Sequence, residues 1–196
     1  MAFITTNWSP NEIPTSAKMQ QMSDNDEALR DGTGLGDESV TNAKLAGDIT
    51  VDKLINPYKF RVTRVSNQAS IANITATTVQ FNNETYDPNN NFNTSTYKYT
   101  VPVSGVYEFN ALVRIDGTDI TVANAIIKGD AGQLSKDYIA TAAVSSVTAR
   151  IHDQLDLVAG DEIYIQVYVG LASGTATIIG TASELWFSGH LLSVTV

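Results

Sequence analysis

The two histidines of the chain are the first residues to test for chemistry, because histidine is the side chain most often used as a general base. His152 is followed by Asp153, and His190 comes shortly after Ser188. These residue types suit a Ser-His-Asp set, but the sequence has no Gly-x-Ser-x-Gly turn and no oxyanion motif. Two histidines at separate positions, in a chain without cysteine, also make a zinc site unexpected. We therefore expect no catalytic residues and no enzyme activity.

Carboxylate pairs are the second candidates for chemistry. Asp116 and Asp119 lie in one expected turn, and Asp161 and Glu162 lie in another. A glycosidase needs two carboxyl groups that face each other across a cleft, and nothing in the sequence brings these pairs together. The aspartates near the start of the chain do not have the spacing of a calcium loop. The sequence thus predicts no metal and no cofactor.

The overall composition excludes several classes of protein. The 196 residues include no cysteine and carry a formal net charge of −9. A disulfide framework is therefore impossible, and the negative charge argues against binding to nucleic acid or to anionic lipid. No apolar run approaches the roughly 20 residues that a membrane-spanning helix needs, and the first residues do not have the pattern of a secretory signal. We expect synthesis in the cytoplasm without membrane insertion.

The pattern of the elements changes at Asn56-Pro57, which ends an acidic N-terminal arm. From Tyr58 onward, apolar and polar residues alternate in short segments, separated by turns rich in Gly, Asn and Asp. The expected strands lie within residues 58–63, 70–81, 97–100, 105–115, 123–128, 138–143, 147–152, 155–158, 163–169, 176–179 and 184–196. About ten short strands and no convincing helix predict an all-β jelly-roll sandwich for residues 58–196.

The segment Lys98–Phe109, with the sequence KYTVPVSGVYEF, resembles a known family. Its Pro followed by Gly-Val-Tyr-x-Phe is similar to the centre of the globular head domain of complement component 1q, a tumour-necrosis-factor-like jelly roll. Three further segments resemble that family in the same order. They are Phe81 with Asn83, Tyr86 and Asp87; Leu155–Gln166; and Phe187–Leu192. The resemblance covers residues 58–196 and departs from the family in the Asn-rich insert before Tyr97 and the short spacing after Phe81.

The resemblance implies a homotrimer, because proteins of this family pack three protomers side by side around a threefold axis. Along residues 163–169, apolar residues alternate with larger polar ones, which predicts a strand with its apolar side in the core. Its other side presents two tyrosines and a glutamine, which suit an interface, although exposure to solvent is the alternative. The predicted interface residues are Tyr107, Tyr164, Gln166 and Tyr168.

Residues 1–57 are expected to form an anchoring arm and a short repeat stalk. Thr15–Leu29 has the pattern of a helix, with Thr15 or Ser16 as its cap. A helix of this length needs a partner to be stable in water. A nine-residue repeat follows, in which Ser39–Gly47 resembles Asp48–Asn56, and its Ile-Thr-x-x-Lys-Leu phrase resembles the shaft repeats of bacteriophage tail and fibre proteins. The predicted anchor residues, which would bind other virion proteins, are Trp8, Met19, Met22 and Leu29.

Together, the two resemblances predict a bacteriophage virion protein on the head or tail surface. It would be a trimeric short fibre or spike whose knob attaches to a glycan or protein of the host cell. Its contact loops would be residues 82–96, 116–121, 130–136 and 170–175. The predicted contact residues are Asn90, Asn91, Asp116, Asp119, Asp130, Lys136 and Ser173. Two alternatives stay open: a decoration or trimerisation protein that binds no receptor, and a capsular depolymerase, which the sequence favours less.

Overall fold

The computed structural model of the chain describes residues 13, 15–30 and 56–195. The chain divides into two compact units, Met1–Ile55 and Asn56–Val196, and each is described by itself. The predicted anchor residue Trp8 and the nine-residue repeat lie outside the described residues, apart from Asn56. We call the second unit the knob.

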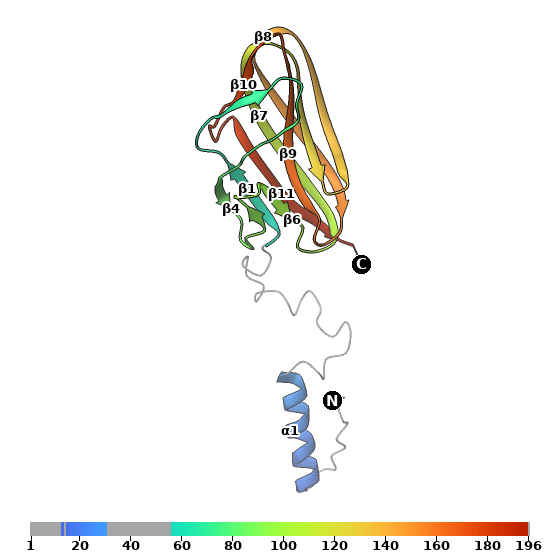
Figure 1. The fold of residues 1–196 in the computed structure, drawn as a ribbon. Helices are drawn as coiled ribbons and strands as arrows, with labels where there is room; N and C mark the ends of the chain where they lie inside the picture. Colours follow the sequence, from blue (N-terminus) through green and yellow to red (C-terminus); the bar gives the residue numbers. More distant parts are fainter. Residues whose placement is uncertain (1–12, 14, 31–55, 196) are drawn as a thin grey trace. The chain divides into compact units, whose positions relative to one another are not determined.

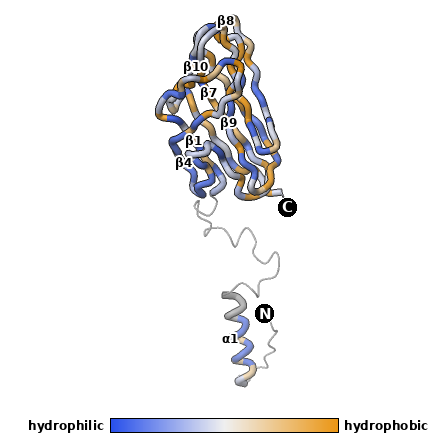
Figure 2. The backbone as a smooth tube through the Cα atoms, in the orientation of Figure 1, coloured by the Kyte–Doolittle hydropathy of each residue, from blue (hydrophilic) through white to orange (hydrophobic). Residues whose placement is uncertain are grey.

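The described part of the first unit is the helix α1 (Ser16–Arg30), which confirms the helix predicted there. Thr15 caps it, because its hydroxyl accepts a hydrogen bond from the Lys18 amide at 3.3 Å and its carbonyl accepts one from the Met19 amide. Met19 and Met22 are exposed, and the coloured part of the helix is mainly hydrophilic in Figure 2. This helix is not long and apolar enough to cross a membrane.

The described part of the knob is built from strands (Figure 1). They are β1 (Lys59–Thr63), β2 (Gln68–Ala72), β3 (Thr77–Thr78), β4 (Asn83–Tyr86), β5 (Phe92–Asn93), β6 (Lys98–Thr100), β7 (Gly105–Gly129), β8 (Gly132–Leu157), β9 (Glu162–Leu171), β10 (Thr175–Ile178) and β11 (Leu185–Val194). All their pairings are antiparallel, in the order β4-β1-β11-β7-β9-β6-β5, with β8 paired to β7. The sheet curls into a jelly-roll sandwich, as predicted from the sequence.

Two long strands, β7 and β8, pass through both layers of the sandwich. The first half of β7 pairs with β11, and its second half pairs with β9. The register shifts between Asp116 and Val122, and bulges of this kind bend a strand sharply. The prediction of separate strands with a loop at residues 116–121 was therefore wrong, because this segment is a bend inside one strand. The segments expected as three strands between Tyr138 and Val158 likewise belong to β8, which ends at Leu157.

The core between the layers follows the alternation of the strands (Figure 2). Aromatic rings dominate it, and those of Phe60 and Tyr99 stack with their centroids 4.3 Å apart. Phe109 and Phe187 pack against the same group. Along β9, all four predicted core residues are completely buried, whereas the residues between them are half-buried. The predicted orientation of β9 is therefore confirmed.

The knob has two ends, which we call the entry end and the far end. At the entry end, the Asn56 side-chain amide donates to the Leu191 carbonyl at 2.8 Å, so the start of the knob lies beside its last strand. Here β7 begins opposite the ends of β8 and β11. The far end is formed by the bend of β7 and by the turn after β9, where the Ala172 amide donates to the Asp119 carbonyl. The last strand also ends at the entry end, because Val194 pairs with Gly105.

Candidate functional site

His152, the first residue considered for catalysis, lies beside Glu108 instead of in a Ser-His-Asp set. The Nε2 atom of His152 lies 3.4 Å from a carboxylate oxygen of Glu108. Hydrogen bonds from Asn110, Gln154 and His152 lower the pKa of Glu108. Within residues 13, 15–30 and 56–195, no group of three or more His, Cys, Asp or Glu side chains is placed to hold a metal ion. The surfaces of the two layers are therefore the stronger candidates for function.

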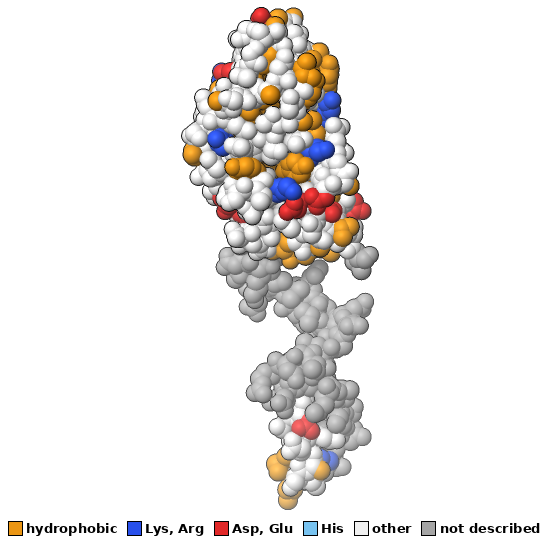
Figure 3. All heavy atoms as spheres, viewed as in Figure 1, with side chains coloured by type: hydrophobic (Ala, Val, Ile, Leu, Met, Phe, Trp, Pro, Cys, Tyr) orange, Lys and Arg blue, Asp and Glu red, His pale blue; other side chains and the backbone are white. Residues whose placement is uncertain are grey.

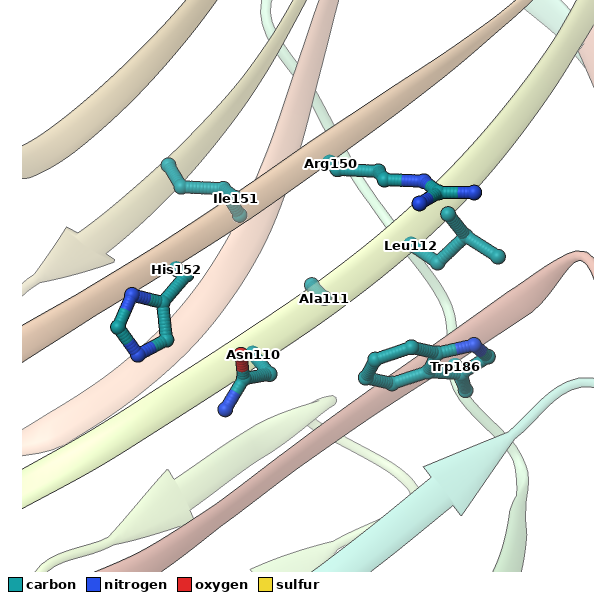
Figure 4. Close-up of a pocket in the computed structure, with 7 residues that line it drawn as sticks. All are labelled: Asn110, Ala111, Leu112, Arg150, Ile151, His152 and Trp186. Atoms are coloured by element: carbon teal, nitrogen blue, oxygen red, sulfur yellow. The ribbon is translucent and has the colours of Figure 1, made fainter.

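The first candidate surface is the outer face of the first layer, where β7, β8 and β11 lie side by side. A shallow hollow of about 520 Å³ is lined by Asn110, Ala111, Leu112, Arg150, Ile151, His152 and Trp186 (Figure 4). Leu112 faces Arg150 across β7 and β8 and faces Trp186 across β7 and β11. We call the surface formed by Leu112, Arg150 and Trp186 the Trp186 face.

The Trp186 face combines apolar and cationic groups. The guanidinium carbon of Arg61 lies 4.5 Å from the centre of the Trp186 ring, which is a cation–π contact. In Figure 4 the guanidinium of Arg150 extends along Leu112, and Arg150 forms no ion pair with the described residues. On this face, a half-buried indole lies beside a leucine and a cation that forms no ion pair with the described residues. Another molecule could pack against such a surface.

The edge of β8 is adjacent to this face and is exceptionally long. Among the described strands, β8 pairs only with β7, so its other edge has no strand beside it over 26 residues. Exposed edges of this length invite pairing with other chains unless they are covered. The middle of β8 is rich in exposed alanine and serine, including Ala142, Ala143 and Ser145. Small side chains of this kind allow another surface to approach the strand closely.

The second candidate surface is the outer face of the second layer. Tyr164, Gln166 and Tyr168 project from β9 on the side away from the core, as the sequence predicts. Their neighbours on β7 and β8 complete a hollow of about 440 Å³. It is lined by Val122, Asn124, Ile126, Gln133, Lys136, Tyr138 and Tyr168. We call the surface formed by this hollow, Tyr164 and Gln166 the tyrosine face.

Lysines accompany the aromatic rings of the tyrosine face. Lys98 pairs with Glu162, and its ammonium lies 5.3 Å from the centre of the Tyr164 ring. The hydrogen bond to Glu162 raises the pKa of Lys98. The ammonium of Lys136 lies 5.6 Å from the centre of the Tyr138 ring, without a carboxylate partner among the residues described. Figure 3 shows cationic, acidic and hydrophobic side chains meeting on one side of the knob.

The structure corrects one of the predicted interface residues. Tyr107 is completely buried inside the protomer, where its hydroxyl donates to the Val103 carbonyl at 2.8 Å. Its side chain cannot reach a second protomer, so the prediction for Tyr107 was wrong. Trp186 and Leu112, which sequence reasoning missed, are the larger apolar groups on an outer face. The alternation of β11 would have placed Trp186 outside, opposite the buried Leu185 and Phe187.

The predicted contact residues do not form one surface. Asp116, Asp119 and Ser173 lie at the far end, where β7 bends and β9 ends. The other residues lie elsewhere, and Lys136 belongs to the body of β8. Asp130 is in the turn between β7 and β8, which lies at the entry end because its carboxylate accepts from the Glu162 amide.

Asn90 and Asn91 also lie near the entry end, since the Asn91 carbonyl accepts from the Thr100 amide, and Thr100 pairs with Glu162 at the start of β9. The loop predicted for residues 82–96 contains β4 and β5, and Phe92 is buried. Its description as one long exposed loop was therefore wrong. Strand pairing at Phe92 and burial of its ring hold this segment against the sandwich.

Comparison with protein family models finds a match over the knob. The family model described as "C1q domain" matches residues 60–192, which is nearly the whole knob. No curated protein sequence matches the chain.

Comparison with solved structures finds the same architecture. The globular domain of the zebrafish complement 1qA protein is 21% identical, with a TM-score of 0.53, over 70% of this chain and 99% of that one. Murine APRIL at pH 5.0 is 10% identical with a TM-score of 0.55, over 69% of this chain and 98% of that one. The Eiger TNF of S. frugiperda is 10% identical with a TM-score of 0.55, over 71% and 94%. At these identities the likeness concerns the fold alone.

Proposed function

Since the chain belongs to the C1q domain family, we propose that it is a non-catalytic binding module in which three knobs assemble around a threefold axis. The observation that carries this proposal is the Trp186 face beside the free edge of β8. The face has a half-buried indole beside a leucine that is 9% exposed, and the edge has no strand beside it among the described residues, so each is a surface that a second protomer would cover.

We propose that the β8 edge of one protomer packs against the Trp186 face of the next. The two surfaces differ, so the contact is head-to-tail, and such a contact closes into a ring when the rotation between protomers is a whole fraction of a turn. The small residues of β8 let the backbone of one protomer come close to Leu112 and Trp186 of its neighbour. The outer face of the second layer stays open in this arrangement.

The trimer would serve as the C-terminal knob of a bacteriophage fibre or spike that attaches to the host cell surface. Two features support this part of the proposal: the likeness of the repeat to phage fibre phrases, and the exposure of Met19 and Met22 on α1. Exposed apolar side chains on a helix suit docking to other virion proteins. Three identical sites on each knob would raise the avidity for a surface by about 10² to 10⁴.

The second candidate is a decoration or trimerisation protein that binds no receptor. The position of the predicted contact residues favours it, since they are divided between the two ends of the knob and the body of β8. In that case the trimer would assemble in the same way, but the isolated knob would not compete for cells.

The first experiment is the native mass of the full-length chain and of a truncated chain starting at Asn56. We expect trimers of both, since the proposed interface lies within the knob. Leu112→Arg should yield monomers with an unchanged circular dichroism spectrum, because the new charge would lie in the contact. Tyr168→Arg is the matched control and should stay trimeric. If Tyr168→Arg is monomeric and Leu112→Arg is trimeric, the interface lies at Tyr164, Gln166 and Tyr168 instead. A monomeric wild-type protein would overturn the proposed trimer.

The second experiment separates a receptor-binding knob from a decoration protein. Purified trimeric knob is added to cells before the virion, and the adsorption of the virion is counted. A fibre knob should reduce adsorption in proportion to its occupancy of the cell surface. Unchanged adsorption at saturating knob, with the trimer intact, would leave the decoration protein as the function.

A further inference from the structure

We propose that the tyrosine face binds an acidic sugar unit, which is a pyranose ring carrying a carboxylate, within a surface polysaccharide. The inference rests on the proposed function, since it names the ligand class for the attachment proposed above. It goes beyond that function because it moves the contact from the loops to the outer face of the second layer.

The shape of the hollow suits one sugar ring. Its volume of about 440 Å³ lies in the range of small-molecule sites, from ~300 to ~1,000 Å³. Tyr138 contributes an aromatic ring that is 61% exposed, and Tyr168 contributes a second, half-buried ring. An aromatic face packs against the C–H side of a pyranose, while its hydroxyl remains free to bond the sugar hydroxyls. Val122 and Ile126 supply the apolar floor.

The polar groups of the hollow are few and fixed. Asn124 is almost completely buried. In one of the two possible orientations of its side-chain amide, both the nitrogen and the oxygen form hydrogen bonds. In that orientation its nitrogen donates to the Ala123 carbonyl at 3.0 Å, and its oxygen accepts from the Lys136 ammonium at 3.3 Å. This contact and the cation–π contact with Tyr138 hold the ammonium at the rim. The ammonium has three donors, so it can also bond a carboxylate of the ligand.

Charge selects an acidic ring over a neutral one. Lys98, on the same face, is already neutralised by Glu162. Lys136 has no acidic partner among the described residues, although the chain as a whole carries a net charge of −9. An anion that entered the hollow would therefore meet an unpaired cation beside aromatic walls, and a charge-assisted hydrogen bond is stronger than a neutral one.

The test measures binding of the full-length chain to immobilised oligosaccharides. The acidic probes are a hexamer of galacturonic acid and an oligomer of sialic acid, and the matched neutral probe is the first hexamer after reduction of its carboxyl groups. We expect binding to at least one acidic probe and at least about tenfold weaker binding to the reduced hexamer, which corresponds to the loss of a charged contact. Equal binding to acidic and reduced hexamers, or no binding to either acidic probe, would overturn the proposal.

Variants locate the site on the knob. Tyr138→Ala and Lys136→Gln should each weaken binding to the acidic probe about tenfold or more, while Lys136→Arg should retain most of it. The matched controls are Tyr86→Ala and Lys59→Gln, which change a tyrosine and a lysine of the first layer and should leave binding unchanged. All variants are compared as trimers of unchanged mass. Equal loss in the controls, or no loss in the Tyr138 and Lys136 variants, contradicts the site.

The failure of this inference is distinguishable from the failure of the proposed function. If the wild-type knob blocks adsorption and the Tyr138→Ala knob blocks it equally, the attachment function stands and the tyrosine face is not the contact. If no knob blocks adsorption but the acidic probe binds in a Tyr138-dependent way, the sugar site stands and the attachment function does not.

Discussion

Gly189 on β11 lies directly against the ring of Phe109 on β7, its partner in the strand register. A methyl group on Gly189 would stand 2.6 Å from Cδ1 of Phe109 and 2.8 Å from Cε1 of Phe60. Both rings are completely buried in the aromatic core, so neither has free space to move into. The absence of a side chain at this position is what allows the two layers to close over the rings.

Gly189→Ala should therefore destabilise the knob. Overpacking a tight core costs about 1–3 kcal/mol of unfolding free energy, and the crowded atoms belong to rings that cannot rotate away. The measurement is urea denaturation, with Ser188→Ala as the control because Ser188 projects outward from the same strand. If the unfolding midpoint equals that of the wild-type protein, the core has space for a methyl group at Gly189 and this prediction is wrong.

Two buried tyrosines should respond differently to the loss of their hydroxyls. The Tyr107 hydroxyl donates to the Val103 carbonyl, whereas the Tyr99 hydroxyl has no hydrogen-bond partner among the described residues. Tyr107→Phe should lower the unfolding free energy by about 1 kcal/mol, since it leaves a partly buried carbonyl unpaired. Tyr99→Phe should be neutral or stabilising. Denaturation of the two variants side by side checks this, and a larger loss for Tyr99→Phe would contradict it.

The knob should lose stability in alkaline solution. Burial raises the pKa of Tyr99, and the nearby Tyr107 and Asp87 add to the effect. In the unfolded chain a tyrosine ionises near pH 10, so above that pH the unfolded state releases a proton that the folded state keeps. The contribution is complete below about pH 10 and is lost as the pH rises through the higher folded value. Thermal unfolding at pH 8 and pH 11 should show a smaller drop for Tyr99→Phe than for the wild-type protein.

Arg114 connects three segments at the far half of the first layer. Its guanidinium pairs with Asp116 on the same strand, contacts Ser146 on β8 and pairs with Glu184 just before β11. Because the group is about one-third exposed, solvent screens part of these interactions, and Arg114→Gln should lower the unfolding free energy only modestly. Lys128→Gln, which removes a cation without an ion pair among the described residues, is the control. Added salt should reduce the difference in unfolding midpoint between the Arg114→Gln and Lys128→Gln variants.

The alternation of the strands was sufficient to predict the jelly roll and the orientation of β9. The same pattern could not show that Asp116–Thr121 belongs to a strand, because Asp and Gly at this point are also turn residues. Asp119 adopts a left-handed φ of 50°, which a turn and a bulge both use. Only the pairing with β8 and β9 on each side of the bend distinguishes the two.

The two candidate surfaces differ in how well they could be predicted from the sequence. Tyr164 and Tyr168 share one strand, so their common side follows from spacing alone. Leu112, Arg150 and Trp186 lie on three strands, and their meeting depends on the registers between β7, β8 and β11. The β7–β11 register joins segments far apart in the chain, and the β7–β8 register at Leu112 depends on the bulges between Leu112 and the turn, so no local pattern specifies either of them. The burial of Tyr107, in contrast, could be predicted from the sequence, because Tyr107 and Phe109 are two residues apart and so lie on the same side of the strand.

The long ribbon of β7 and β8 has a consequence for how the knob folds. Its single turn at Asp130–Ala131 joins strands of 25 and 26 residues, so pairing can begin between close neighbours in the chain and proceed outward. Contacts between near neighbours form faster than contacts that must first close a large loop. Because the finished ribbon runs through both layers, neither layer can open without breaking its hydrogen bonds. We expect amide hydrogens along β7 to exchange together and last, as one cooperative unit.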